Sequence, residues 1–110
     1  MKERLNYNEI IKYMCSYYDI TLDKMIRLLK KREYKYMLLL LLKNYDCINI
    51  DELKEMFELK EGKIIRNNIR NAEEMLLFNG FFREKYFCME HYIQKNSVND
   101  KKTLDINKKM

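Results

Sequence analysis

The spacing of apolar residues between positions 49 and 78 predicts two helices joined by a short polar turn. The first helix has a single apolar face, formed by Ile50, Leu53, Met56 and Phe57. Asn49 followed by Glu52 has the form of a capping box at its start. Residues 58–62 interrupt the pattern, and Gly62 can supply the positive φ that such a turn often needs. The second helix has an apolar stripe of Ile65, Ile69, Ala72 and Leu76.

A second stripe on the same predicted helix is basic. Lys63, Arg66, Asn67 and Arg70 recur at positions i, i+3, i+4 and i+7, away from the apolar stripe. A DNA-reading helix has this arrangement, with its apolar side on the scaffold and its basic side free for phosphates and base edges. An ordinary amphipathic pair with a solvated basic face fits the same pattern.

The remaining segments predict a single all-α domain, a small helical bundle of about five or six helices over residues 1–94. We expect helices from about Tyr7 to Tyr18, after Thr21, from about Glu33 to Asn44, and from about Phe81 to Gln94. Asn6 and Thr21 are candidate N-caps, and Asn79-Gly80 is a candidate C-terminal signal for the helix before it. A two-stranded wing is the alternative for residues 81–89, but the apolar period favours a helix. Residues 95–110 show little apolar periodicity, which predicts a mobile basic tail.

Composition supports a helical, globular domain. The chain has 110 residues, which is enough for one hydrophobic core. It has no proline and only two glycines, so it contains few residues that break helices. Its longest apolar run, Met37 to Leu42, is too short to span a bilayer and predicts a central buried helix. The N-terminus lacks the apolar core of a secretion signal, so we expect a cytoplasmic protein with no membrane contact. Cys15, Cys47 and Cys88 have no paired spacing and are expected to be small buried hydrophobic residues.

The positive charge is concentrated in one segment. Residues 24–35 contain six basic residues against Glu33 alone, so this segment carries the whole formal net charge of +5. Such a patch suggests a polyanionic partner, although a charge run can also be a solvated face. Its candidate DNA contacts are Lys30, Lys31, Arg32 and Lys35, to which Lys60 in the predicted turn is added.

Motifs for catalysis or for cofactor binding are absent from the sequence. The single histidine, His91, has no cysteine or histidine partner at the spacing of metal ligands. No nucleophile elbow, phosphate-binding Gly-rich loop or dinucleotide fingerprint occurs. We therefore expect no cofactor, no metal and no enzymatic activity.

The segment from about Ile10 to Leu77 resembles the C-terminal DNA-binding domain of the bacterial replication initiator DnaA. The resemblance is carried by residues 19–26 (DITLDKMI), by residues 30–33 (KKRE), by residues 48–57 (INIDELKEMF) and by Ile65, Ile69, Arg70 and Glu73-Glu74. It implies a helix-turn-helix that binds double-stranded DNA. The family's signature turn departs here: Lys60 and Glu61 keep its charges, while Gly62, Lys63 and Ile64 replace a histidine and hydroxyl residues.

These observations lead to two hypotheses about function. The first is a small DNA-binding protein, a regulator of transcription or replication, which uses the second helix and the basic connector. The alternative is a helical protein-interaction module that kept the fold and lost DNA reading. The acidic first helix, with Asp51, Glu52, Glu55 and Glu58, motivates this alternative.

Overall fold

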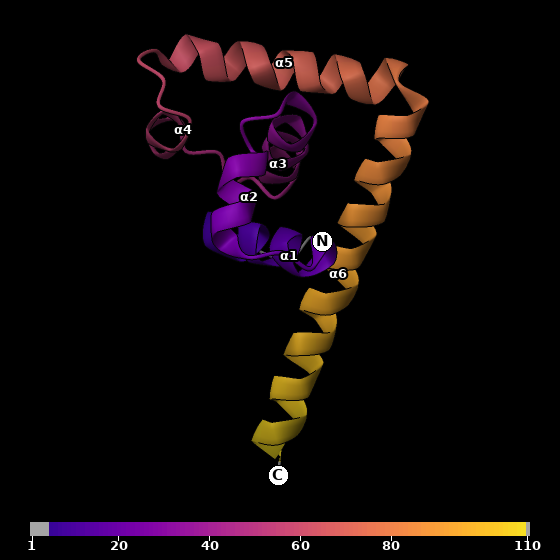
Figure 1. The fold of residues 1–110 in the computed structure, drawn as a ribbon. Helices are drawn as coiled ribbons and strands as arrows, with labels where there is room; N and C mark the ends of the chain where they lie inside the picture. The colour runs from indigo at the N-terminus through magenta and orange to yellow at the C-terminus, as the bar shows by residue number, and fades with distance from the viewer. Residues whose placement is uncertain (1–4, 110) are drawn as a thin grey trace.

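The computed structural model describes the backbone of residues 5–109 and the side chains of residues 5–97. This part of the chain forms six helices and no strand, which confirms the predicted all-α class (Figure 1). The helices are α1 (Tyr7–Tyr18), α2 (Leu22–Leu28), α3 (Arg32–Asn44), α4 (Ile50–Met56), α5 (Gly62–Phe78) and α6 (Gly80–Lys109).

Three of the helices begin at residues whose side chains cap the first turn, as predicted. Asn6 and Glu9 form a complete capping box at the start of α1. The hydroxyl of Thr21 accepts a hydrogen bond from the backbone N–H of Lys24 at 3.2 Å. The side chain of Asn49 accepts one from the N–H of Glu52 at 3.1 Å, but the return bond from the Glu52 side chain does not form, so only half of the predicted capping box is present. Each cap satisfies an N–H group that has no partner inside its helix, so these residues determine where the three helices start.

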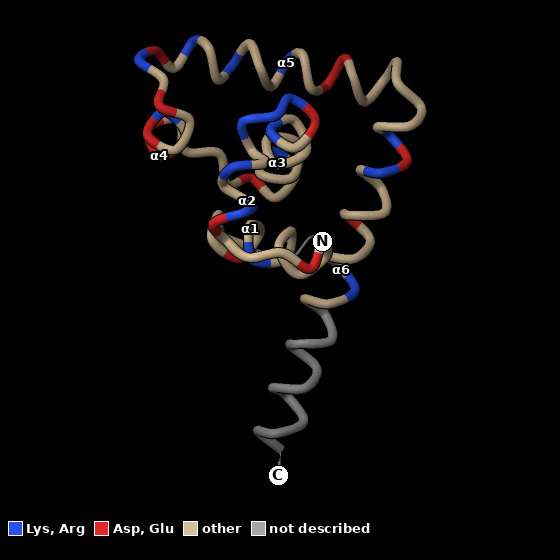
Figure 2. The backbone as a smooth tube through the Cα atoms, viewed as in Figure 1, with Lys and Arg blue, Asp and Glu red and all other residues tan. Residues whose placement is uncertain are grey.

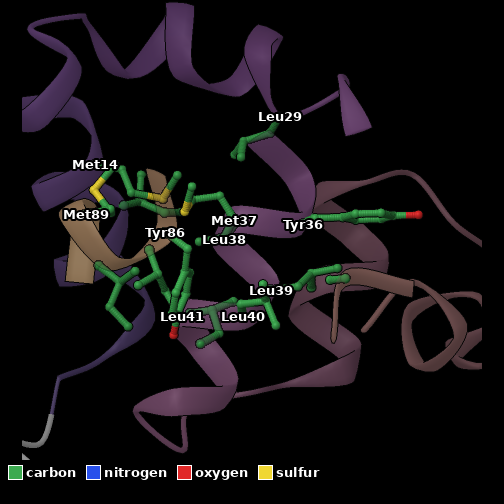
Figure 3. Packing of buried hydrophobic residues seen from close by; sticks show 14 of the residues in the cluster. Met14, Leu29, Tyr36, Met37, Leu38, Leu39, Leu40, Leu41, Tyr86 and Met89 are labelled. Carbon is green, nitrogen blue, oxygen red and sulfur yellow. The ribbon is translucent and has the colours of Figure 1, made fainter. Parts of the chain in front are cut away.

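Helix α3 is the central element of the core. Every residue from Tyr36 to Leu42 is buried, as the unbroken apolar run predicted. Helices α1, α5 and α6 all pack on α3. Met14 of α1 and Met89 of α6 meet beside Met37 on one side of it (Figure 3). In Figure 1, α5 crosses above α3 and α1 lies below it, so the two helices cover opposite sides of the core.

The segment after Asn79 forms a helix, α6, as predicted, and not the alternative two-stranded wing. Its predicted end near Gln94 is wrong. The helix continues to Lys109. Its buried stripe of Phe82, Tyr86, Met89 and Ile93 is extended by Ser97, which is only 4% exposed. The Ser97 hydroxyl donates to the carbonyl of Gln94 at 3.2 Å, so a polar residue can occupy a core position here. The side chains beyond residue 97 lie outside the described part, and the mobility of the segment 95–110 stays a prediction.

The junction between α5 and α6 lies where predicted, but it is built differently. Neither Asn79 nor Gly80 has a positive φ, so no left-handed cap ends α5. Asn79 instead caps α6, because its side-chain oxygen accepts the N–H of Phe82 at 3.0 Å. Arg83 donates to the carbonyls of Leu76 and Leu77 at 3.3 and 2.9 Å. Asn79 is the only residue between α5 and α6, and the two helices meet at the sharp corner seen in Figure 1.

The cysteines match their predicted surroundings only in part. Cys15 and Cys47 are half-buried, and burial raises the pKa of both thiols above the ordinary value. A raised pKa favours the protonated thiol and disfavours nucleophilic chemistry. Cys88 is exposed, so its predicted burial is wrong. It directly precedes the buried Met89 in α6 and falls outside the apolar stripe of that helix.

Candidate nucleic-acid interface

Helices α4 and α5 are joined by a turn of five residues, 57–61, and pack against each other. Leu53 of α4 and Ile65 of α5 are fully buried. The chain reverses at Glu58, which has a φ of 55° in the left-handed region. The next residue, Leu59, donates its N–H to the carbonyl of Lys54 at 2.8 Å. The turn was thus located correctly from the sequence, but its positive φ was assigned to the wrong residue.

Gly62 is needed for close packing rather than for an unusual φ. It is the first residue of α5, and its φ is not positive. A Cβ atom at this position would lie 2.7 Å from the Cγ2 methyl of Ile50 in α4. Real Cβ contacts are longer, and a β-branched side chain has little freedom to move away. The absence of a side chain at Gly62 therefore sets how closely α5 approaches α4.

Replacing Gly62 with alanine should lower the free energy of unfolding by about 1–3 kcal/mol, because it overpacks the contact with Ile50. Gly80 is the matched control. It is also the first residue of a helix, and its nearest potential contact is Arg83 Nη2 at 3.8 Å. Gly80→Ala should be neutral or slightly stabilising. Urea unfolding curves of the two variants provide the comparison, and equal effects would contradict the steric role of Gly62.

The basic stripe of α5 is accessible along its whole length. Lys63, Arg66, Asn67 and Arg70 all face solvent. On the other side of the helix, Ile65 and Ala72 are buried and Ile69 and Leu76 pack against the core. This side covers α3, with which α5 is in contact. The two predicted stripes therefore lie on separate faces of α5, and the basic one is available to a partner.

The exposed basic residues of α5 form no ion pair with a described acidic side chain. The described side chains form two ion pairs, Lys43–Glu73 at 2.6 Å and Lys85–Glu33 at 2.8 Å. Neither pair involves the exposed basic residues of α5. Their positive charge is consequently free to act on an approaching anion.

The basic connector between α2 and α3 is also exposed. Lys30, Lys31 and Arg32 all face solvent. The acidic residue that follows them, Glu33, is held by Lys85 of α6. The hydrogen bond to Glu33 raises the pKa of Lys85, which keeps this amine protonated. Glu33, the acidic residue that follows the connector in sequence, is therefore paired with Lys85 and not with a connector residue.

Lys35 links the connector region to the turn between α4 and α5. It is half-buried, and its Nζ atom lies 5.2 Å from the centre of the Phe57 ring in a cation–π contact. Lys60, three residues beyond Phe57, is exposed in the turn. Figure 2 shows the basic positions of the connector and of α5 in the same upper part of the molecule. Lys35 thus contacts the turn from the first part of α3, and its half-buried amine is less available to a partner than its sequence position suggested.

Two apolar surface features were not predicted from the sequence. Leu22 and Ile26 of α2, which share the apolar period of Met25 and Leu29, are exposed and line a groove of about 710 Å³ with α1 and α4. Leu77, Phe78 and Phe81 are exposed where α5 meets α6. Phe78 and Phe81 fall outside the helical period of their buried neighbours, and this is the one sequence signal that could have marked them.

The described residues contain no candidate for a metal site or for a membrane-spanning helix. Within this part of the chain, no cluster of three or more histidine, cysteine or acidic side chains could hold a metal ion. Likewise, none of the described helices has the length and apolar character needed to cross a membrane.

Comparisons of this chain with protein-family models, with curated proteins and with solved structures find no match. The likeness to the DnaA C-terminal domain therefore rests only on the sequence motifs described above. Its implication of DNA binding stays a prediction.

Proposed function

We propose that this protein binds duplex DNA through the exposed basic face of α5, with the α2–α3 connector adding contacts to phosphates. The observation that carries the proposal is the exposure of Lys63, Arg66, Asn67 and Arg70 on one face of a helix whose other face is packed on the core. Such a protein would act in the cytoplasm as a regulator of transcription or replication.

The side chains on α5 suit the major groove. The helix has 17 residues and is about 25 Å long, and the groove of B-DNA is wide enough to admit a helix. Arg66 and Arg70 can each make two hydrogen bonds to a guanine edge, and Asn67 can do so with adenine. Lys60 and Lys63, near the start of the helix, carry point charges suited to phosphates. The same face can therefore supply both affinity and sequence preference.

The connector has a different role in this proposal. Lys30 and Lys31 lie in the turn before α3 and Arg32 is the first residue of that helix, so the three supply charge without a continuous helical face for reading bases. They should therefore bind phosphates irrespective of sequence. Lys35 would act mainly by holding the start of α3 against the turn beside α5.

Changing Lys30 and Lys31 together to glutamine should weaken binding to every duplex. The dependence of log K on log[salt] should become shallower by about 0.9 for each phosphate that the variant no longer neutralises. Titrations of unrelated duplexes at several salt concentrations measure both effects. Lys12→Gln is the control, since Lys12 is exposed on α1, on the opposite side of the core from α5. An unchanged salt slope in the double variant would exclude the connector from the interface.

A protein-interaction module is the second candidate function, and one observation favours it. The described surface contains three large apolar side chains, Leu77, Phe78 and Phe81, exposed together at the α5–α6 corner. Contiguous apolar surface of this kind is typical of interaction sites. The corner lies at the C-terminal end of α5, whereas the basic residues lie in its N-terminal half. One chain can therefore bind DNA and a protein partner at separate places.

A further inference from the structure

The strongest unexplained feature of the surface is the α5–α6 corner, defined by Leu77, Phe78 and Phe81. These side chains are 68%, 85% and 82% exposed. Together they offer roughly 400 Å² of apolar surface, a patch of the size that is often functional on monomeric proteins. In Figure 1 the corner projects away from the body formed by α1–α3, so it is accessible to a partner.

A hollow adjoins the corner. It has a volume of about 470 Å³ and lies between α3, α5 and α6. Four apolar or aromatic residues line it together with three polar ones: Leu40, Leu76, Leu77 and Tyr86, with Lys43, Asn44 and Glu73. Leu77 belongs to both features, so the apolar corner borders the hollow through this residue. Cavities of about 150 Å³ can accept benzene, and this hollow therefore has room for a phenyl ring.

We propose that this surface is a homodimer interface, in which Phe78 or Phe81 of each copy enters the hollow of the other. A two-fold dimer requires one patch that is complementary to itself, and adjacent rings and hollow provide this. The corner supplies about half of the roughly 800 Å² that each partner contributes to a standard interface, so we expect a dimer at the small, weak end of the range.

The charges around the corner favour a second copy over a polyanion. Glu74, Arg83 and Glu84 are exposed beside the apolar patch, and the Lys43–Glu73 ion pair borders the hollow. A two-fold axis can place the acidic residues of one copy opposite the basic residues of the other. DNA or an anionic membrane would meet unfavourable carboxylates here. This proposal does not depend on DNA binding.

Sedimentation equilibrium of the full chain, from low micromolar to several hundred micromolar, tests the proposal. The mass should rise with concentration from 13.7 kDa to twice that value and then stop. Changing Phe78 and Phe81 together to serine should raise the dissociation constant at least about 100-fold, because each change occurs twice in the dimer. These side chains are exposed in the monomer, so the circular-dichroism spectrum should keep its helical form.

Leu22→Ser is the matched control, because Leu22 is a similarly exposed apolar residue at a site remote from the corner. Its dissociation constant should equal that of the unchanged chain. Three results would overturn the proposal. The chain could stay monomeric at all concentrations, whether or not the corner then binds lipid vesicles or another protein. The mass could grow beyond a dimer, or the dimer could be unaffected by the two serine substitutions.

Discussion

Replacing Leu39 or Leu42 with alanine should lower the free energy of unfolding by about 2–5 kcal/mol, the largest effect that we expect from a single substitution. Both side chains are completely buried in α3, the helix on which α1, α5 and α6 pack. Each change removes apolar packing and leaves a cavity that these helices can only partly close. For a domain whose total stability is about 5–15 kcal/mol, such a loss can leave a large unfolded fraction.

Urea unfolding followed by circular dichroism measures this effect, with Leu22→Ala as the control. Leu22 is 55% exposed, so its truncation should change stability by about 0.5 kcal/mol or less. A result in which the two α3 variants are as stable as the control would contradict the central position of this helix.

The fold could be predicted from the sequence because its local signals agree with its long-range packing. Asn6, Thr21 and Asn49 are side-chain caps, and each begins a helix. The apolar run in α3 is long enough to cover the helix on all sides, which only a central element can accommodate. The capping residues and the pattern of buried residues thus indicate the same helix boundaries. A fold can be predicted from sequence where local and long-range preferences agree in this way.

The errors have two causes, a contact between separate helices and local side-chain bonds for which the sequence offers more than one partner. Gly62 was expected to serve the turn, but its role depends on Ile50, which a neighbouring helix brings to it. Asn79 does end α5, as predicted, but not through a left-handed cap, and its side chain caps the helix that follows. Ser97 was assigned to a tail because it is polar. It is nevertheless buried, since its hydroxyl donates a hydrogen bond to the backbone carbonyl of Gln94 in the same helix. Spacing alone cannot identify Ile50, whereas the partners of Asn79 and Ser97 lie three residues away and were available as local alternatives.

The candidate interface was predictable to a similar extent. Helical spacing placed the basic residues of α5 on one face, and the structure confirms their exposure. Spacing could not show that Glu33 pairs with Lys85 or that Lys35 lies over Phe57, because these contacts join residues distant in sequence. Those two contacts determine which charges of the connector are free.

The second large effect concerns the proposed reading face of α5. Replacing Arg66 or Arg70 with alanine should reduce binding to a preferred DNA site by about 1–3 kcal/mol, with a smaller reduction on random DNA. The reason is that a guanidinium can make two directed hydrogen bonds to a guanine, and alanine can make neither. Both arginines are exposed and lack an ion-pair partner among the described side chains, so their removal should leave the fold intact.

A gel-shift titration of duplex DNA at two salt concentrations tests the central claim most directly. It compares the unchanged chain, the Arg66→Ala/Arg70→Ala variant and the Lys12→Ala control, after sequence selection has identified a preferred site. We expect binding that weakens with salt, a combined reduction of about 2–6 kcal/mol for the α5 variant on the preferred site, and no more than a small change for the control. The absence of binding at low salt, or equal binding by the α5 variant and the unchanged chain, would contradict DNA recognition by α5.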